Sequence, residues 1–444
     1  MTPARTICLG FLSVILLGTL LLMLPIATQS GQWGAPIIAL FTSTSAVCVT
    51  GLAVVDTGTY FSPWGQACIL LLFQIGGLGY MTSMTVLVLL LGRRFRLKDK
   101  LAIQQALDQS GLGGVRQLLF SILLTTAIVE LTGTFLLLPA FAADYGWSQG
   151  LWLALFHSVS AFNNAGFSLF KDSLMGYVGS PLVTGTISGL IIAGGIGYQV
   201  LIEVYLWCRD WVQRRTERTR FCLNTRVVVS TTLVLLILGT GGFWAIEINN
   251  AKTFGQLDWS SQILAAWFQS VTSRTAGFNS IDIGQMSTTA LFICIALMFI
   301  GGSPGGTAGG IKTTTLRVLV RATRAILHGQ QEIILYERQI PVILVYKAIA
   351  VFIGSLGAMI VATTLLSLTD PEFTFIQIWF EVVSAFATVG LSMGITAAIS
   401  PLGKLVLICT MYTGRVGVLL LMSALVGDPK PTRTHYPEET FLVG

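Results

Sequence analysis

Near the end of the chain, residues 384–394 read SAFATVGLSMG. Within it, Thr388, Val389 and Gly390 spell TVG. Potassium-channel filter loops contain the same triplet and line the pore with their backbone carbonyl oxygens. The chemistry of such a loop is cation coordination, because the carbonyl oxygens replace the water around a dehydrated ion. A triplet of this kind also occurs by chance in long apolar proteins, so its weight depends on whether it recurs.

The stretch recurs three times upstream, in residues 41–54, 156–169 and 268–280. In each copy an aromatic residue precedes a Ser/Thr-rich turn, and a glycine follows with Leu or Phe directly after it. The four glycines lie 111 to 115 residues apart, so the matched contexts indicate an internal repeat even in a chain with 47 glycines. The four predicted filter quartets are Val49-Thr50-Gly51-Leu52, Asn164-Ala165-Gly166-Phe167, Thr275-Ala276-Gly277-Phe278 and Thr388-Val389-Gly390-Leu391.

Each repeat has a long apolar segment, a shorter semi-polar segment that ends at the glycine, and a second long apolar segment. The short segment leaves about ten to thirteen residues of helix, half the thickness of a membrane. Irregular backbone after such a half-helix cannot face lipid, because its amides and carbonyls would lack partners. The segments are 7–27, 36–52 and 64–91; 116–139, 149–167 and 180–207; 226–246, 259–278 and 286–326; 341–368, 373–391 and 399–426.

The predicted fold is therefore an all-α integral membrane protein with four consecutive membrane helix–pore loop–membrane helix repeats. Eight spanning helices and four half-membrane pore helices would surround a pseudo-fourfold central pore, with K+ held by the filter carbonyls. The expected divisions are repeat 1 at 1–91, repeat 2 with a cytoplasmic linker at 92–207, repeat 3 with a gating loop at 208–326, repeat 4 at 327–426, and a cytoplasmic tail at 427–444.

Composition supports a membrane protein: 53% of the 444 residues are hydrophobic and 10% are charged, with a mean hydropathy of +0.77. Basic residues gather in the connections between repeats, which predicts a multi-pass protein of the cell inner (plasma) membrane with both termini cytoplasmic. The net charge of +6 then needs no nucleic acid to explain it. Seven scattered cysteines without C-x-x-C, and three distant histidines, support neither a disulfide framework nor a zinc site.

A glycine-rich block, GGSPGGTAGGIKTTT, occupies residues 301–315 and must break the last apolar segment of repeat 3. A nucleotide P-loop is disfavoured because Ile311 intervenes before Lys312. Two interpretations stay open: close helix packing through small residues, and an irregular loop under the filter that must move for ions to pass. So many glycines would leave the loop little to hold it in one conformation. Under the second interpretation the gate residues would be Gly301, Gly302, Ser303, Pro304, Gly305, Gly306, Thr307, Ala308, Gly309, Gly310, Lys312 and Arg415.

Arg415 lies near the middle of an apolar helix, where an arginine costs on the order of 2.5–3.5 kcal/mol. It must therefore face water, the bundle interior or a partner group. One interpretation is an ion pair with Glu130 or Glu203, and the other is a positive barrier in the pore that contacts residues 301–310. Arg274 is assigned to the outer side of the membrane with Lys171, Lys252 and Lys404.

Four such repeats in one chain resemble the Trk/Ktr/HKT superfamily of potassium transporters, through NNAGFS, SRTAGFN, ATVGLS and GGSPGGTAGGIKT. The resemblance covers the whole chain and is nearest to the Ktr-type membrane subunit. It implies potassium uptake through each subunit, the gate role of residues 301–310 and Arg415, a homodimer, and a cytosolic ring of Ktr/RCK-type regulatory subunits that carries the nucleotide. In that family a serine at the position of Gly51 accompanies sodium permeation, so the glycine favours potassium. Repeat 3 is one residue shorter before its glycine, which leaves its register open.

Two other classes of function remain as alternatives: a membrane-embedded enzyme, and a structural scaffold without ion conduction. An enzyme would need paired acids, a metal cluster or an activated nucleophile at membrane depth, and no such constellation recurs. We therefore expect no enzyme activity and no bound cofactor beyond K+. A filter and a gate are compatible with three modes of transport. These are a passive channel, a proton-coupled carrier, and a carrier for which Na+ is the coupling or activating ion.

Overall fold

The computed structural model describes residues 3–79, 115–214, 220–330 and 332–426. The predicted cytoplasmic tail, most of the linker before repeat 2, and the end of the last segment of repeat 1 lie outside these residues. The described part is helical apart from short turns and one antiparallel hairpin, in which β1 (Ile334–Leu335) pairs with β2 (Arg338–Gln339).

The first segment of every repeat forms one long helix. These helices are α1 (Pro3–Met23), α7 (Val115–Tyr145), α11 (Leu223–Glu247) and α15 (Val342–Thr369). All four are long and apolar enough to cross a membrane.

The four short helices end where the filter quartets begin: α2 (Pro36–Val47), α8 (Trp147–Phe162), α12 (Trp259–Thr272) and α16 (Phe375–Phe386). Two have 12 residues as predicted, but α8 has 16 and α12 has 14. Their last turns are buried, including polar side chains such as Ser43, Ser158 and Ser270. These polar side chains therefore lie inside protein and not against lipid.

The second segments of repeats 2, 3 and 4 are broken, whereas the sequence patterns of repeats 2 and 4 predicted continuous helices. α9 (Pro181–Ile196) meets α10 (Tyr198–Val212) at 111°, and α17 (Pro401–Val416) meets α18 (Val418–Val426) at 96°. The breaks fall at Gly197 and Gly417, whose φ angles are 93° and 88°, values that only glycine adopts at low cost. In repeat 3, the glycine-rich block separates α13 (Thr288–Phe299) from α14 (Thr313–Leu327) as predicted. In repeat 1, α4 (Pro63–Leu78) ends at Gly79 with φ 83°.

A serine begins each of these second segments. The side chains of Ser62, Ser180, Ser287 and Ser400 accept a hydrogen bond from the backbone N–H three residues ahead. In three of the four a proline follows the serine, which suits the first position of a helix because proline has no N–H to satisfy.

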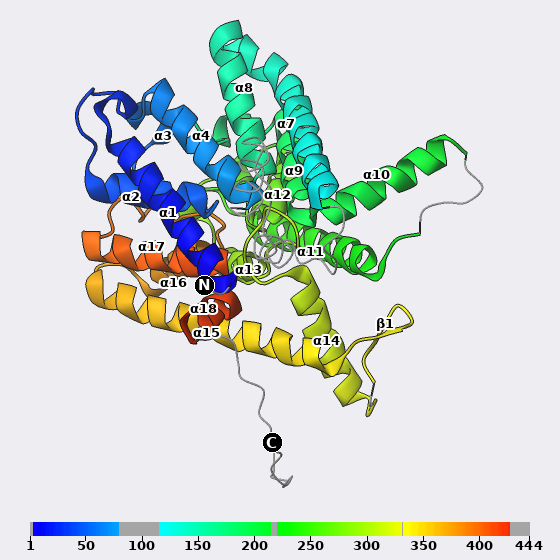
Figure 1. Cartoon of the computed structure of the whole chain (residues 1–444). Helices are drawn as coiled ribbons and strands as arrows, with labels where there is room; N and C mark the ends of the chain where they lie inside the picture. Colours follow the sequence, from blue (N-terminus) through cyan, green and yellow to red (C-terminus); the bar gives the residue numbers. More distant parts are fainter. Residues whose placement is uncertain (1–2, 80–114, 215–219, 331, 427–444) are drawn as a thin grey trace.

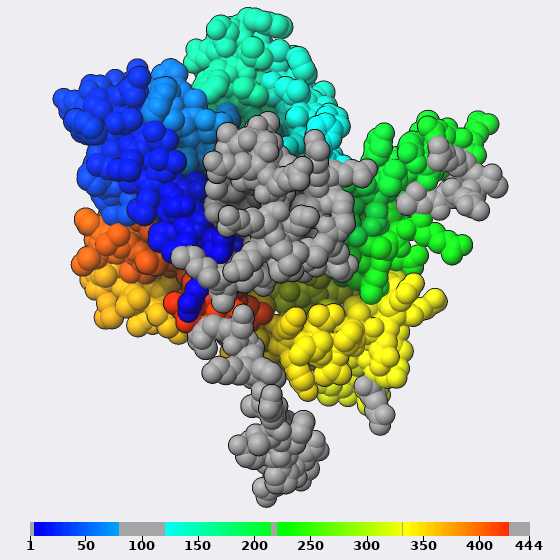
Figure 2. Space-filling model, viewed as in Figure 1, coloured from blue at the N-terminus to red at the C-terminus, as the bar shows by residue number. Residues whose placement is uncertain are grey.

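The repeats contact one another in a closed order. α4 packs on α8, α9 on α12, α13 on α16, and α17 returns to α2 of the first repeat. At this last junction α18 also packs on α1, so the first described residues lie beside α18 (Figure 1). The Arg5 Nε donates to the Ala424 carbonyl at 2.7 Å, and the Tyr412 hydroxyl donates to the Cys8 carbonyl at 2.8 Å. By contrast, α10 projects from the body of the protein (Figure 2).

Candidate functional site

The four predicted quartets share one backbone conformation. The first residue of each has a positive φ, between 51° and 71°, and so does the glycine in third place, between 70° and 94°. Because all four follow this pattern, the quartet of repeat 3 is in register with the others, and its missing residue falls between Thr272, at the end of α12, and the quartet. The residues concerned are Val49, Asn164, Thr275 and Thr388, and Gly51, Gly166, Gly277 and Gly390.

The four glycines lie against one another in cyclic order. A Cβ built on Gly51 would stand 2.6 Å from the Ala165 carbonyl oxygen, and one on Gly166 would stand 2.9 Å from that of Ala276. The Cβ positions of Gly277 and Gly390 would overlap the carbonyl oxygens of Val389 and Thr50. Each glycine therefore faces the next repeat, and the fourth faces the first.

A side-chain hydroxyl near the end of the preceding helix forms a hydrogen bond with the backbone at every quartet. Ser45 Oγ accepts from Gly51 N at 3.0 Å, and Ser384 Oγ accepts from Gly390 N at 3.1 Å. In repeats 2 and 3 the hydroxyl donates instead, from Ser160 to the Phe167 carbonyl at 2.8 Å and from Thr272 to the Phe278 carbonyl at 2.6 Å. The hydroxyl lies six residues before the glycine in repeats 1, 2 and 4 but five before it in repeat 3, because the stretch between this hydroxyl and the quartet is one residue shorter there.

Several oxygen atoms in the quartets are buried and have no hydrogen-bond partner. They are Thr50 Oγ1, Thr275 Oγ1, Thr388 Oγ1 and Asn164 Oδ1. Orphaned buried oxygens are rare in native proteins because each carries a desolvation cost. The C-terminal ends of α2, α8, α12 and α16 also point partial negative charge at the quartets. A potassium ion, as transported cargo, would supply these oxygens with the positive partner that they lack.

A cavity of about 440 Å³ opens on one side of the quartets and is lined by all four filter glycines. We call it the filter-side cavity. Its wall also carries Asp56, Asp172 and Asp282 against one cation, Lys171. This excess of negative charge raises the local concentration of cations.

The glycine-rich loop, residues 301–312, is held by backbone hydrogen bonds, whereas the sequence predicted a loosely held segment. Gly301 N donates to Ile311 O at 3.0 Å and Gly302 N to Gly309 O at 3.2 Å, so the loop folds back on itself. Ser303 N and Thr307 N donate to Gly195 O and Gly194 O at 2.9 and 3.0 Å, next to the break between α9 and α10. The glycines permit this close approach, which side chains would obstruct.

The loop also touches the filter directly. A Cβ on Gly309 would overlap Thr388 Oγ1. Asn164 Nδ2 donates to Thr307 Oγ1 at 3.0 Å, and Thr307 Oγ1 donates to the Phe162 carbonyl at 3.1 Å. The glycine-rich loop thus lies against the quartets of repeats 2 and 4.

Three cationic side chains bind carbonyl oxygens of the glycine-rich loop. The Arg415 guanidinium donates to the Thr307 carbonyl at 2.6 Å and also to the Gly76 carbonyl in α4. Lys312 Nζ donates to the Ala308 carbonyl at 2.8 Å, and the Arg274 guanidinium donates to the Gly301 carbonyl at 3.2 Å. Positive charge therefore surrounds the loop on the side away from the filter-side cavity.

Among the described residues, Arg415 forms no ion pair with Glu130 or Glu203. Glu130 accepts from Asn163 Nδ2 at 3.0 Å and from Gln74 Nε2 at 3.3 Å, and Glu203 accepts from Cys222 N at 3.1 Å. The carbonyl contacts favour the interpretation in which Arg415 acts on the loop.

The sequence pattern groups Arg274 with the outer cations and does not indicate its contact with the glycine-rich loop. Its side chain is buried against Gly301, at the level of the loop. The signal that would have found it is a charged residue inside the half-helix segment itself, directly before a filter quartet.

A second cavity, of about 550 Å³, lies on the other side of the glycine-rich loop. It is lined by Arg415, Lys312, residues 304–306 and 308–311, and the glycines that end or break the second segments, Gly79 and Gly417. We call it the loop-side cavity. The four filter glycines line the filter-side cavity and are absent from the wall of this one.

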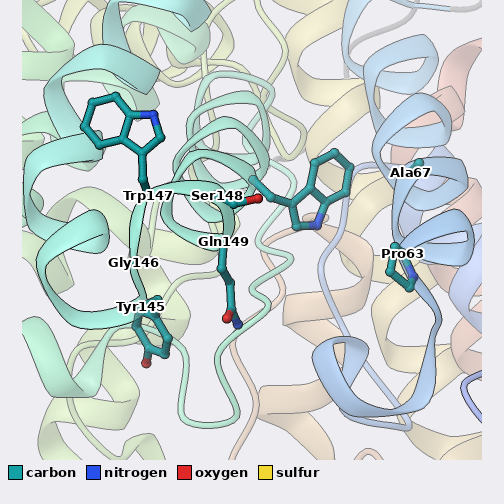
Figure 3. Close-up of a pocket in the computed structure, with 8 residues that line it drawn as sticks. Pro63, Ala67, Tyr145, Gly146, Trp147, Ser148 and Gln149 are labelled. Atoms are coloured by element: carbon teal, nitrogen blue, oxygen red, sulfur yellow. The ribbon is translucent and has the colours of Figure 1, made fainter.

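A groove of about 660 Å³ lies apart from the filter, between the start of α4 and the turn that joins α7 to α8. Figure 3 shows Pro63 and Ala67 on one side and Tyr145 to Gln149 on the other. Its wall has no carboxylate or cationic side chain. Trp147 is 72% exposed, as is usual for aromatic residues at the edge of a membrane.

The fold and the site define a polytopic membrane protein in which four loops meet around cation-coordinating groups. The chain belongs to the TrkH family of cation transport proteins, which matches residues 3–428. It is 40% identical to the Ktr system potassium uptake protein B of Bacillus subtilis (strain 168), over 100% of this chain and 97% of that protein. It is 41% identical to the protein of the same name from Vibrio alginolyticus, over 99% and 94%.

Two further comparisons agree with this family. The potassium/sodium uptake protein NtpJ of Enterococcus hirae is 37% identical, with 100% of this chain and 98% of that protein covered. The crystal structure of the potassium transporter TrkH from Vibrio parahaemolyticus has a TM-score of 0.70 at 18% identity, and covers 95% of this chain and 85% of that one. At this identity the likeness shows the fold. The relatives are named as transporters and not as enzymes.

Proposed function

We propose that the chain is the ion-conducting membrane subunit of a Ktr-type potassium uptake system. K+ would enter through the filter-side cavity, lose its water at the four quartets, and leave through the loop-side cavity when the glycine-rich loop moves. The observation that carries this proposal is the cyclic contact of the four glycines, together with the orphaned oxygens beside them.

The proposal also includes the topology of the chain in the membrane. Each repeat would contribute two membrane crossings, with the broken second segments counted as one crossing each, and the eight crossings would enclose a pseudo-fourfold pore. Four unbroken helices and two bent pairs account for up to six of these crossings. Both termini would lie in the cytoplasm, on the side where basic residues gather.

The glycine-rich loop would be the gate, held closed by Arg415, Lys312 and Arg274. In support, the loop lines the loop-side cavity and is fastened to the second, third and fourth repeats. The names of the two Ktr relatives refer to a system, which supports a partner subunit, and in this proposal the partner is cytosolic, regulatory and carries the nucleotide. The name of the Enterococcus hirae relative includes sodium, so Na+ is the ion to test as a second cargo or an activator. A homodimer is the proposed assembly.

Uptake into vesicles that contain the purified chain, with and without its regulatory partner, would test the proposed function. We expect K+ to accumulate faster than Na+ when each is offered alone. Empty vesicles and vesicles with the Gly390→Ser variant serve as controls. A structural scaffold or a membrane-embedded enzyme predicts no uptake of either ion above empty vesicles, with and without the regulatory partner.

A further inference from the structure

Three arginines on α14 share one face of the helix. Arg317, Arg321 and Arg324 follow the spacing i, i+4 and i+7, which places their side chains in one stripe. They line a pocket of about 130 Å³ between α14 and the β1–β2 hairpin. The hairpin closes the pocket with Ile334, Leu335 and Tyr336, and Arg321 Nε donates to the Ile334 carbonyl at 2.7 Å.

None of the three arginines forms an ion pair with a described residue. The one ion pair among the described residues joins Arg209 to Asp210 in α10. Arg317 Nε is buried and has no hydrogen-bond partner, although the rest of its side chain is partly exposed. A guanidinium presents paired N–H groups in a planar fork that matches the oxygens of phosphate.

The volume of the pocket limits the size of the ligand that it can hold. Sites for drug-sized molecules and cofactors usually enclose about 300–1,000 Å³, and this pocket holds about 130 Å³. It has room for one phosphate group but not for a whole nucleotide.

Apolar side chains beside the arginines point to a lipid as the source of that phosphate. Val320 is 50% exposed and lines the same pocket, and Ile326 and Leu327 at the end of α14 are 76% and 78% exposed. A helix that combines cationic and exposed apolar side chains in this way is typical of the membrane surface. The basic residues of α14 belong to the side that the charge asymmetry assigns to the cytoplasm, where the lipid leaflet is anionic.

We propose that Arg317, Arg321 and Arg324 form a binding site for the phosphate of an anionic phospholipid in the cytoplasmic leaflet. The site has a direct connection to the glycine-rich loop, because α14 begins at Thr313, one residue after Lys312. Thr313 N donates to the Gly302 carbonyl at 3.0 Å, and the hydroxyls of Ser303 and Thr313 are 2.9 Å apart. A lipid bound there would anchor the helix from which the loop extends. This proposal concerns binding and does not depend on the conducted ion.

The test measures the melting temperature of the purified full-length chain in nanodiscs. One set contains phosphatidylcholine alone, and the other contains equal parts of phosphatidylcholine and phosphatidylglycerol. We expect phosphatidylglycerol to raise the melting temperature of the natural chain. The Arg324→Gln variant should lose part of this increase, and Arg321→Gln/Arg324→Gln should lose most of it. Arg324 is exposed and its side chain has no recorded hydrogen bond, so the single variant should fold.

A matched control removes two other exposed cations, in Arg214→Gln/Arg220→Gln, and should keep the full increase. If Arg324→Gln and the double variant both keep the increase, the lipid site does not exist. Inorganic phosphate added to the phosphatidylcholine nanodiscs gives the second arm. An equal increase with phosphate alone would show that the site takes a free anion and would overturn the lipid assignment. Binding of an acidic polypeptide to α14, without any effect of lipid, would overturn it in favour of a protein partner.

Discussion

Each of the four filter glycines meets two requirements that a residue with a side chain would not meet at low cost. It adopts a positive φ, and it leaves room for a neighbouring carbonyl. Gly51 has both a φ of 92° and the Ala165 carbonyl oxygen 2.6 Å from where its Cβ would be. A side chain there must displace backbone that itself lines the filter. The effect of a substitution should therefore appear in ion selectivity before it appears in stability.

We expect Gly51→Ser to lower the ratio of K+ to Na+ uptake, and Gly277→Ser and Gly390→Ser to do the same. A loss of about 1.4 kcal/mol in the preference for K+ would change that ratio about tenfold. Uptake of each ion into vesicles measures the ratio. Gly31→Ser is the control, because Gly31 also has a positive φ, 68°, but open space around it. Unchanged ratios at all three filter positions would remove the filter assignment.

Arg415 provides the second test at a single residue. Arg415→Gln should raise K+ flux because it removes a positive charge from beneath the filter and weakens the contact with the Thr307 carbonyl. Its bonds go to neutral carbonyls, so its removal leaves no buried carboxylate without a partner and should change the melting temperature little. Lys404→Gln is a control that removes another cation bound to a backbone carbonyl. A fall in stability of about 3–5 kcal/mol without faster flux would instead indicate a buried ion pair.

At the scale of elements, the glycine-rich loop connects four of them. It leaves α13, folds back through the contact of Gly302 with Gly309, docks on the break between α9 and α10, and enters α14. Its hydrogen bonds are mostly to backbone, and each contributes about 0.5–1.5 kcal/mol. A regulatory subunit that pulls on α14 therefore has a defined set of bonds to break.

Deleting Ser303 to Thr307 should give rapid K+ flux that no longer needs the regulatory partner. The deletion removes the contacts with Gly194, Gly195 and Arg415, so the segment can no longer block the path. Flux into vesicles with and without the partner measures this. A packing role for the glycines predicts a misfolded or inactive chain.

A milder pair of variants separates these two outcomes. Thr307→Val removes the hydroxyl that bonds to Asn164 and Phe162 but preserves the shape of the side chain, and Thr307→Ser keeps the hydroxyl. The gate hypothesis expects faster flux from the valine variant than from the serine variant. Equal flux from both, at the level of the natural chain, would count against the gate.

The elements themselves were largely predictable because apolar length and turn chemistry are local properties. The quartets could be located from the Ser/Thr-rich turn and the glycine that follow each aromatic residue. The breaks at Gly197 and Gly417 could not, because a single glycine in an apolar run resembles the many that continue a helix. The contact of Arg274 with the loop could not be predicted either, because a charged residue in the sequence does not indicate which distant segment it will meet.

At the scale of the whole molecule, the circle of repeats is closed without a covalent bond between the fourth repeat and the first. α17 and α18 pack on α2 and α1, and the hydroxyl of Tyr412 reaches the Cys8 carbonyl. The other three junctions have a chain connection as well as packing. The junction between repeats 4 and 1 is therefore the place where the circle can open.

Tyr412→Phe should lower the free energy of unfolding by about 0.5–1.5 kcal/mol, the usual contribution of one hydrogen bond. Thermal melting in nanodiscs measures the change. Tyr346→Phe is the control, because Tyr346 is 63% exposed on α15. Equal melting temperatures for the two variants would mean that this hydrogen bond adds nothing to closure.

The non-covalent junction between repeats 4 and 1 also has a consequence for the synthesis of the chain. The chain emerges from the ribosome in order, and the wall that contains Gly390 is the last of the four to be made. Until α16 and α17 have inserted, the glycines of repeats 1 to 3 face one another with one side missing, and the positive side chain of Arg415 is not yet under them. A chain interrupted before Gly390 therefore cannot complete the ring of four glycines on which the proposed selectivity depends.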